Sequence, residues 1–345
     1  MPLEFLVRAD LPVIQAPMAG SQDSALAIAV CDGGGLGSLA CASLGIEAMR
    51  AQLEILTTRN DLAYNLNFFC HATPAPDAAR EQAWRSLLRP YYDEFGLEAA
   101  ALPASASRLP FDNTMCSLLE EYRPPVVSFH FGLPCPALLQ RIRAWGGKVV
   151  SSATTVEEAR WLEARGVDAV IAQGLEAGGH RGHFLSADLS LQSGTFPLLR
   201  RIVRAVEVPV IAAGGIADRE GVAAALALGA SAVQVGTSYL LCPEATTSAV
   251  HRSALQSGAS LHTALTNLFS GRPARGIVNR LMRELGPVNA EAPDFPLAAT
   301  ALAPLRAHCE GRGNGDFSPL WAGQDTGGCR SIPAAEMTRR LAGTG

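Results

Sequence analysis

The sequence predicts an α/β fold, a closed (β/α)8 TIM barrel with a small helical subdomain after the eighth strand. Eight short apolar runs, rich in Val, Ile and Ala, alternate with segments of helical periodicity. The runs do not alternate polar and apolar residues, which is typical of parallel strands covered on both faces. The strand count favours a barrel over the alternative, an open doubly wound sheet, since no Gly-x-Gly-x-x-Gly sequence opens the first unit.

The predicted strands recur at intervals that leave room for a helix between them. They are residues 13–17, 36–40, 63–69, 126–131, 149–153, 169–173, 208–213 and 232–239. Helices are predicted over residues 136–145, 156–165 and 219–228. Thr155 and Asp218 precede the last two helices and are expected to cap them, because a side-chain oxygen there accepts free N–H groups of the first turn.

Two long segments exceed the barrel repeat and are expected to form additional structure. Residues 71–112 separate the third and fourth strands, and residues 243–320 follow the eighth strand with helix-like stretches broken by Gly and Pro. We therefore expect a barrel over residues 1–242 and a small helical capping subdomain over residues 243–320. The C-terminal segment, residues 321–345, is expected to pack back on the barrel.

The composition is that of a globular protein. Of the 345 residues, 48% are hydrophobic and 17% are charged, and the formal net charge is −4. These values indicate neither disorder nor binding to nucleic acid or an anionic membrane.

Lys148, the only lysine, stands where a strand begins, which argues against a Schiff-base aldolase. The eight cysteines form no Cys-x-x-Cys pair, and no metal site is expected. Without a signal peptide or a long apolar span, the sequence predicts a cytoplasmic protein.

Glycine-rich loops follow the seventh and eighth predicted strands, where barrels of this kind commonly bind phosphate. The seventh strand runs into Gly214 and Gly215 directly before a helix, and the eighth ends in Gln234-Val-Gly-Thr237. Backbone N–H groups and a helix N-terminus at such strand ends bind anions. The two loops at adjacent strand ends therefore indicate a phosphorylated ligand.

The best catalytic candidate is His180, in the segment Glu176-Ala-Gly-Gly-His-Arg-Gly182 after the sixth predicted strand. We expect the glycines to place it on a flexible, exposed loop at the active face, where a neutral imidazole can take a proton from an acidic C–H group. Glu176 is expected either to orient His180 or to cap the next helix. His130, at the end of the fourth strand, is a second candidate, and Asn67 is expected to point an amide inward from the third.

Several short motifs, spread over most of the chain, match those of a known family. They are Gln15-Ala-Pro-Met18, Ser128-Phe-His-Phe-Gly132, Glu176-Ala-Gly-Gly-His-Arg-Gly182, Ala213-Gly-Gly-Ile-Ala217, Gln234-Val-Gly-Thr237 and Leu320-Trp-Ala-Gly-Gln324. In this combination the chain resembles the nitronate monooxygenase family, formerly called 2-nitropropane dioxygenases, which are FMN-dependent barrels. The Gly-Gly-His segment alone is shared with flavin-dependent enoyl-acyl-carrier-protein reductases and with related NAD(P)H:quinone reductases.

The resemblance implies an FMN enzyme that oxidises alkyl nitronates, or nitroalkanes, with O2 to carbonyl compounds and nitrite. His180 would be the base that deprotonates a nitroalkane or the group that orients a nitronate, and His130 would be a second active-site histidine. The phosphate of FMN would lie on Gly214, Gly215, Gly236 and Thr237. The other residues expected to bind the cofactor are Ala16, Met18, Asn67, Gln173, Gly178, Gly179 and Gln234.

One departure from the family concerns the substrate entrance. In the better-known members, tyrosines and a lysine line it, but residues 104–111 and 295–306 contain neither type. The substrate is therefore the least defined part of the prediction, and an NAD(P)H-dependent flavin reductase of an enoyl thioester or a quinone is the alternative. A flavin-binding protein without turnover is a third hypothesis, against which His180 argues. The implied partners are a small nitronate and O2, and a homodimer is left open.

Overall fold

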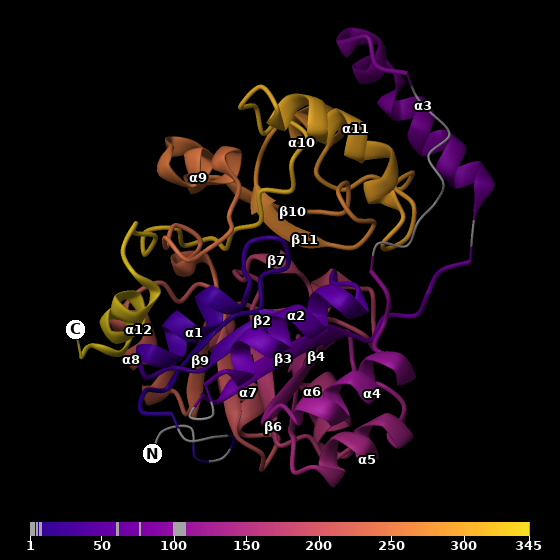
Figure 1. Cartoon of the computed structure of the whole chain (residues 1–345). Helices are drawn as coiled ribbons and strands as arrows, with labels where there is room; N and C mark the ends of the chain where they lie inside the picture. Colours follow the sequence, from indigo (N-terminus) through magenta and orange to yellow (C-terminus); the bar gives the residue numbers. More distant parts are fainter. Residues whose placement is uncertain are drawn as a thin grey trace.

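The structure is a computed structural model that describes residues 4, 6, 9–59, 62–75, 77–98 and 108–344. A barrel forms the lower part of the molecule in Figure 1, and a second lobe lies above it. The eight barrel strands pair in parallel in the order β1-β9-β8-β6-β5-β4-β3-β2, and a parallel bridge between Ile14 and Leu36 closes the ring. The predicted (β/α)8 barrel is therefore confirmed, and the open sheet is excluded.

The barrel strands coincide with the predicted runs to within a few residues, and their side chains are almost all buried. Their bounds are β1 (Val13–Gln15), β2 (Gly37–Ala40), β3 (Tyr64–Phe69), β4 (Val126–His130), β5 (Lys148–Ala153), β6 (Ala169–Gln173), β8 (Val210–Ala213) and β9 (Ala232–Val235). The two-residue strand β7 (Gly179–His180) lies outside the barrel, so the seventh and eighth predicted strands are β8 and β9. The eighth run is shorter than predicted, because residues 237–239 form a short 3-10 helix.

Helices surround the barrel as the apolar periodicity predicts. They are α1 (Ser24–Asp32), α2 (Ile46–Thr57), α4 (Asn113–Tyr122), α5 (Pro136–Ala144), α6 (Val156–Glu163), α7 (Thr195–Val203) and α8 (Arg219–Ala227). Both predicted caps are confirmed: the side chain of Thr155 accepts from the N–H of Glu158, and that of Asp218 accepts from the N–H of Gly221.

Polar side chains fill part of the barrel interior and bond to one another. The side chain of the fully buried Gln15 accepts the N–H of Ser38 at 2.9 Å and donates to Gln22 at 2.8 Å. Asn65 donates to the hydroxyl of Ser38 at 3.0 Å. Such pairing is what permits polar groups in a core, and here it links β1, β2 and β3 where the barrel closes.

The segment after the eighth barrel strand forms what we call the cap, residues 243–320. It contains the helices α9 (Ala249–Gln256), α10 (Arg280–Leu285) and α11 (Ala298–Glu310), and also the antiparallel strands β10 (Thr263–Thr266) and β11 (Ala274–Ile277). The strands were not predicted, and they are short. Strand β11 also pairs with β7, which comes from the barrel loop after β6, so a three-stranded sheet joins cap and barrel.

Helix α3 (Ala78–Phe95), from the long segment between the third and fourth strands, packs on the cap rather than on the barrel (Figure 1). The indole N–H of Trp84 donates to the carbonyl of Ala298 at 3.2 Å, and the Tyr92 hydroxyl donates to that of Ala301 at 2.7 Å. Trp84 and Tyr92 share one hydrophobic core with α11. The upper lobe is therefore built from two distant parts of the chain.

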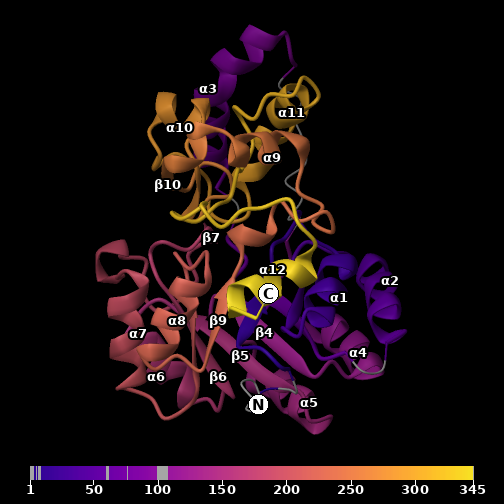
Figure 2. The same ribbon diagram turned by 90° about the vertical axis from the view of Figure 1, so that its left-hand side faces the viewer.

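The C-terminal helix α12 (Ala334–Ala342) packs against α1 and α8 on the outside of the barrel, as Figure 2 shows. The hydroxyls of Thr338 and Tyr239 lie 2.9 Å apart, so the helix also bonds to the short 3-10 helix after β9. Among the described residues, no helix is long and apolar enough to cross a membrane.

The close approach of β2 to α1 gives a test of the fold. A methyl group on Gly37 would lie 2.0 Å from the carbonyl oxygen of Ala27, whereas one on the exposed Gly258 would meet nothing within 4 Å. Gly37→Ala should therefore lower the free energy of unfolding by about 2 kcal/mol or more, through overpacking against backbone. Gly258→Ala, the matched control, should change it by less than about 0.5 kcal/mol.

Urea denaturation followed by circular dichroism measures both variants. Equal stabilities for the two would contradict the packing of α1 on β2.

Candidate active site

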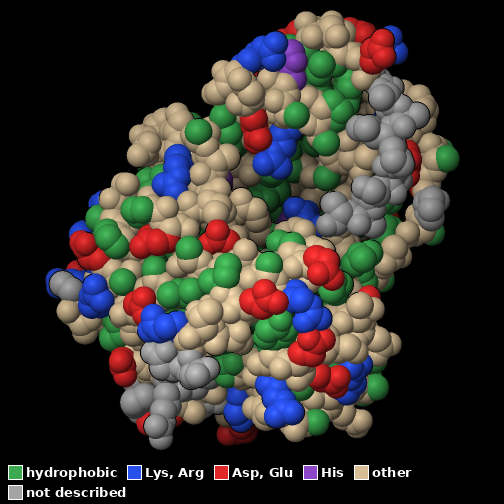
Figure 3. Space-filling model, viewed as in Figure 1, with side chains coloured by type: hydrophobic (Ala, Val, Ile, Leu, Met, Phe, Trp, Pro, Cys, Tyr) green, Lys and Arg blue, Asp and Glu red, His purple; other side chains and the backbone are tan. Residues whose placement is uncertain are grey.

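A cavity lies at the carboxyl ends of the barrel strands, beneath the cap. The space-filling view in Figure 3 shows the face hollowed between the two lobes. Its empty volume, counted out to the open mouth, is about 1350 Å³. The structure brings all the predicted site residues to its wall: Ala16, Met18, Asn67, His130, Gln173, Gly178, Gly179, His180, Gly214, Gly215, Gln234, Gly236 and Thr237.

The loops after β8 and β9 present backbone N–H groups to this cavity. Within the described residues, the N–H groups of Gly215, Ile216, Gly236 and Thr237 donate to no other residue. Gly214 and Gly215 have φ values of 112° and 66°, a region that favours glycine. The Thr237 hydroxyl oxygen accepts the N–H of Gly323 at 2.9 Å, which leaves its own hydrogen to donate. Free backbone N–H groups and a hydroxyl that can donate are the groups that bind an anion in proteins.

Two amide side chains on the cavity wall have groups left for a ligand. Asn67 donates to the hydroxyl of Ser128 at 3.0 Å, and its carbonyl oxygen has no partner among the described residues. The side chain of Gln234 makes no hydrogen bond there at all. A polar ring with donors and acceptors on its edge therefore has partners on both β3 and β9.

His180 does not lie on a flexible, exposed loop, so this prediction was wrong. It belongs to β7, where it is paired with Ala274 of β11, and its side chain is only partly accessible. Its ring is surrounded by aromatic rings, with the centroid of Phe295 at 5.2 Å and that of Trp321 at 5.6 Å. The Nε2 atom lies 2.9 Å from the Ser270 hydroxyl, while Nδ1 has no partner among the described residues. Nδ1 is thus the ring atom left for a ligand.

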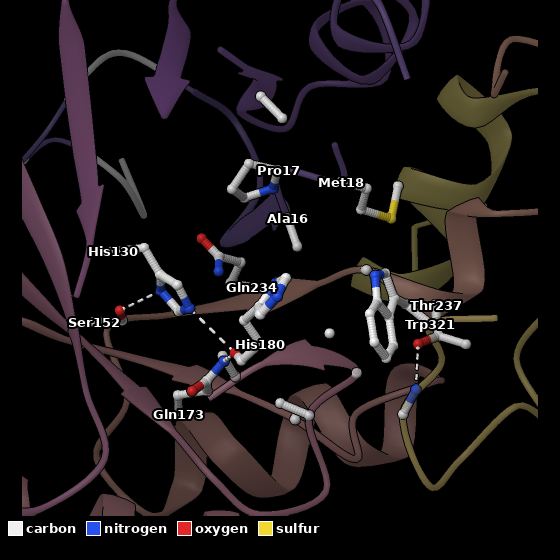
Figure 4. A pocket seen from close by; sticks show the side chains of 18 of the residues that line it. Ala16, Pro17, Met18, His130, Ser152, Gln173, His180, Gln234, Thr237 and Trp321 are labelled. Carbon is white, nitrogen blue, oxygen red and sulfur yellow. Dashed lines mark hydrogen bonds between the residues drawn. The ribbon is translucent and has the colours of Figure 1, made fainter. Parts of the chain in front are cut away.

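The backbone of His180 is held by two side chains that reach it from the barrel, as Figure 4 shows. Its carbonyl oxygen accepts from Nε2 of Gln173 at 2.9 Å and from Nε2 of His130 at 3.1 Å. The side-chain oxygen of Gln173 accepts the N–H of Gly182 at 2.8 Å. Gln173 lines the cavity, but its oxygen and one amide hydrogen are used to hold the His180 segment in place.

His130 has a fixed tautomer. Because a carbonyl oxygen only accepts, Nε2 of His130 carries the hydrogen that bonds to His180. Burial lowers the pKa of His130 to about 3, so the ring is neutral and Nδ1 is bare. Nδ1 then accepts the hydroxyl hydrogen of Ser152 at 2.6 Å. Both ring nitrogens are engaged in these bonds, so His130 holds the carbonyl of His180 and keeps no free lone pair on its ring.

The surroundings of the cavity keep its histidines in the neutral form. Burial, with smaller contributions from Arg108, His130, Arg272 and His71, holds the pKa of His180 well below its usual range. The guanidinium of Arg272 lies 4.2 Å from the ring centroid of Phe131, close to these histidines. A neutral His180 at pH 7 is the form that a general base requires.

Glu176 caps the next helix, which is the second of its two expected roles. Its carboxylate accepts the N–H of Thr195, the first residue of α7, at 2.8 Å. The cavity wall also contains residues that were not singled out from the sequence: Phe69, Arg108, Ser152, Trp321, Gly323 and Asp325. Of these, only Trp321 and Gly323 lie in a motif that pointed to the site.

The barrel, the cavity at the carboxyl ends of its strands and a neutral histidine on the wall define a barrel enzyme. A family model described as nitronate monooxygenase matches residues 2–342. A nitronate monooxygenase from Pseudomonas aeruginosa is 44% identical over 333 residues, which cover 96% of this chain and 95% of that protein. Another, from Paraburkholderia phytofirmans, is 41% identical and covers 97% and 92%. The chain belongs to the nitronate monooxygenase family and is an oxidoreductase.

Solved structures agree with this assignment. A nitroalkane oxidase from Streptomyces ansochromogenes superposes with a TM-score of 0.89 at 36% identity and covers 100% of this chain and 97% of that one. FabK from Thermotoga maritima superposes with a TM-score of 0.72 at 26% identity, with 98% and 94% covered.

Buried neutral histidines predict a stability that falls in acid. Burial is the main cause that lowers the pKa of His71, His183 and His251 to about 4, against about 6.5 in an unfolded chain. Between these values the unfolded state binds more protons than the folded state. The free energy of unfolding should therefore fall as the pH is lowered from about 6.5 to 4, by about 1.4 kcal/mol per pH unit for each histidine.

Urea denaturation at a series of pH values measures this slope. His251→Gln removes one of the histidines with a lowered pKa and should reduce the slope by about 1.4 kcal/mol per pH unit. A free energy of unfolding that stays constant between pH 6.5 and 4.5 would show that these imidazoles are not buried in the neutral form.

Proposed function

We propose that the protein oxidises alkyl nitronates, and nitroalkanes after deprotonation, with O2 to carbonyl compounds and nitrite, using FMN. The observation that carries the proposal is His180, a neutral histidine whose Nδ1 has no partner among the described residues, on the wall of a cavity that also presents free backbone N–H groups. The relatives named nitronate monooxygenase and nitroalkane oxidase support it, since they share the whole length of the chain.

The residues present fit FMN. Its phosphate would accept from the free N–H groups of Gly215, Ile216 and Gly236 and from the Thr237 hydroxyl. A methyl group on Gly236 would lie 3.3 Å from the Cβ of Ala16 and 3.6 Å from the sulfur of Met18, so the glycine keeps this part of the wall open. Asn67 and Gln234 would hold the polar edge of the flavin, and Gly178, Gly179, Gly214 and Met18 would line its bed.

The protein's own residues bind, orient and deprotonate the substrate. When bound, FMN would supply the redox chemistry that links oxidation of the substrate to O2. The Ser270 hydroxyl lies 3.3 Å from the carbonyl of Arg272, and when it donates there, its oxygen accepts the Nε2 hydrogen of His180. Nδ1 of His180 is then the base for the C–H next to the nitro group. The aromatic rings around it limit access of water.

The alternative, an NAD(P)H-dependent flavin reductase, is separated from this proposal by one experiment. The purified holoprotein should consume O2 and release nitrite with a nitronate, and NADH or NADPH should not bleach its flavin rapidly under anaerobic conditions. Nitrite release from no nitronate, together with rapid bleaching, would favour the reductase instead.

Replacing His180 tests its role as a base. His180→Gln should lower kcat/KM for a neutral nitroalkane by about 10²- to 10⁴-fold, the usual worth of a general base. The loss should be smaller for the corresponding nitronate, which has already lost its proton. Steady-state O2 consumption measures both, and the flavin spectrum shows that cofactor is retained.

His262→Gln, at an exposed histidine outside the cavity wall, is the matched control and should keep both activities. Full activity of the His180 variant on both substrates would refute the assignment.

Thr237 tests the phosphate site. Thr237→Val removes the hydroxyl that remains free to donate, so the dissociation constant for FMN should rise about tenfold or more, as for a lost hydrogen bond to a charged group. Thr237→Ser keeps the hydroxyl and should bind FMN nearly as well as the parent protein. Fluorescence titration of the apoprotein with FMN measures both, and an unchanged constant for Thr237→Val would place the phosphate elsewhere.

A further inference from the structure

A stretch of the C-terminal segment runs along the cavity wall beside the loops after β8 and β9. It comprises residues 321–329, which we call the strap, and it leads from the cap sheet toward helix α12. Trp321, Gly323 and Asp325 of the strap line the cavity together with Thr237. The strap therefore borders the part of the cavity where a phosphate would lie.

Three hydrogen bonds join the strap to the barrel loops. The N–H of Gly323 donates to the Thr237 hydroxyl at 2.9 Å (Figure 4), and the Cys329 thiol donates to the Thr237 carbonyl at 3.1 Å. The N–H of Gln324 donates to the carbonyl of Glu176, in the loop after β6, at 2.9 Å. Thr237 is thus held by the strap at its side chain and at its backbone.

Gly328 packs the strap onto the point where the loops after β8 and β9 meet. The Ser238 hydroxyl donates to the carbonyl of Ala217 at 3.3 Å, which links these two loops. A methyl group on Gly328 would lie 2.0 Å from that carbonyl oxygen and 2.6 Å from the hydroxyl oxygen of Ser238. Only a residue without a side chain permits this approach, so the strap rests against both loops at once.

The strap brings no positive charge to the site. Residues 321–329 include no lysine or arginine and one acidic residue, Asp325. Any effect of the strap on an anion must therefore come from the donors that it orients. Because the oxygen of Thr237 accepts from Gly323, its hydroxyl hydrogen is left for a ligand. Donors that are held in place before a ligand binds lose less entropy on binding.

We propose that the strap is a positioning element for the phosphate end of the cofactor. Through Gly323 and Cys329 it holds Thr237, and with it the free N–H groups of the loop after β9, in the arrangement that accepts a phosphate. The inference rests on the proposed use of FMN and adds the C-terminal segment to its site. Because the strap acts through Thr237, a displaced strap should weaken binding of the phosphate more than binding of the flavin ring.

The test compares FMN with riboflavin, which has the same ring and ribityl chain but no phosphate. The parent apoprotein should bind FMN more tightly than riboflavin. In Gly328→Ala, whose methyl group would push the strap off both loops, the preference for FMN should fall about tenfold or more, as for a lost hydrogen bond to a charged group. Fluorescence titration of the apoprotein with each compound measures the two dissociation constants.

Two further alanine variants are the matched controls. Gly37→Ala creates an equally close contact with backbone outside the strap, 2.0 Å from the carbonyl oxygen of Ala27. It should lower stability but leave the preference for FMN within about twofold of that of the parent protein. Gly327→Ala changes the neighbouring strap residue, where a methyl group would meet only the exposed carboxylate of Asp325, at 3.1 Å. It should also leave the preference within about twofold.

Cys329 provides a milder change that does not depend on the folding of Gly328→Ala. Cys329→Ala removes the hydrogen bond to the Thr237 carbonyl and should lower the preference for FMN about threefold, since a bond between neutral groups is worth less. Cys329→Ser keeps a donor at that position and should restore most of the preference.

Equal weakening of FMN and riboflavin in Gly328→Ala and Cys329→Ala would overturn the inference, because the strap would then act on packing alone. An equal loss of preference in Gly37→Ala would overturn it too, since general destabilisation would be responsible.

Nitrite release separates this inference from the proposed function. If no nitronate is oxidised but the preference for FMN depends on the strap, the proposed oxidation fails and the role of the strap stands. If nitrite is released while the preference is unchanged in Gly328→Ala and Cys329→Ala, the role of the strap is refuted and the proposed function stands. Binding of neither FMN nor riboflavin would refute both.

Discussion

The carbonyl oxygen of His180 is the point on which the site depends. Gln173 and His130 both donate to it from barrel strands, at 2.9 and 3.1 Å. This fixes the backbone of β7 over the cavity, and β7 in turn pairs with β11 of the cap. The same segment therefore belongs to the barrel wall and to the cap sheet. Its position decides where the imidazole lies and how the cap sits above the cavity.

The second constraint is electrostatic. Arg108 lies in the cavity wall and Arg272 lies near it, and neither forms an ion pair within the described residues. Arg272 also has a buried Nε without a partner there. Their charge adds to burial in keeping His180 neutral. The same positive potential favours anions, whether a phosphate, a nitronate or a carboxylate. The nearby cations therefore have two effects: they disfavour the protonated form of His180, and they attract an anionic ligand.

Much of the fold follows from local signals in the sequence, and much of the site does not. The barrel strands and the caps at Thr155 and Asp218 were predicted because buried parallel strands and N-caps leave short patterns. Strand β7 was missed because two residues carry no periodicity, and its partner Ala274 lies far along the chain. The docking of α3 was missed for the same reason: Trp84 looks like any core residue until its contact with Ala298 is seen.

The site residues divide by the part of the fold that supplies them. Those that hold or form the reactive centre lie at barrel strand ends and on β7, where backbone pairing limits movement. Arg108 and Phe295 come from segments outside the barrel repeat, and Ser270 comes from the cap loop between β10 and β11. A change at Arg108 leaves the hydrogen bonds to the His180 carbonyl intact, because none of them involves the segment that carries it. Segments outside the barrel repeat therefore line the cavity without holding the backbone of His180.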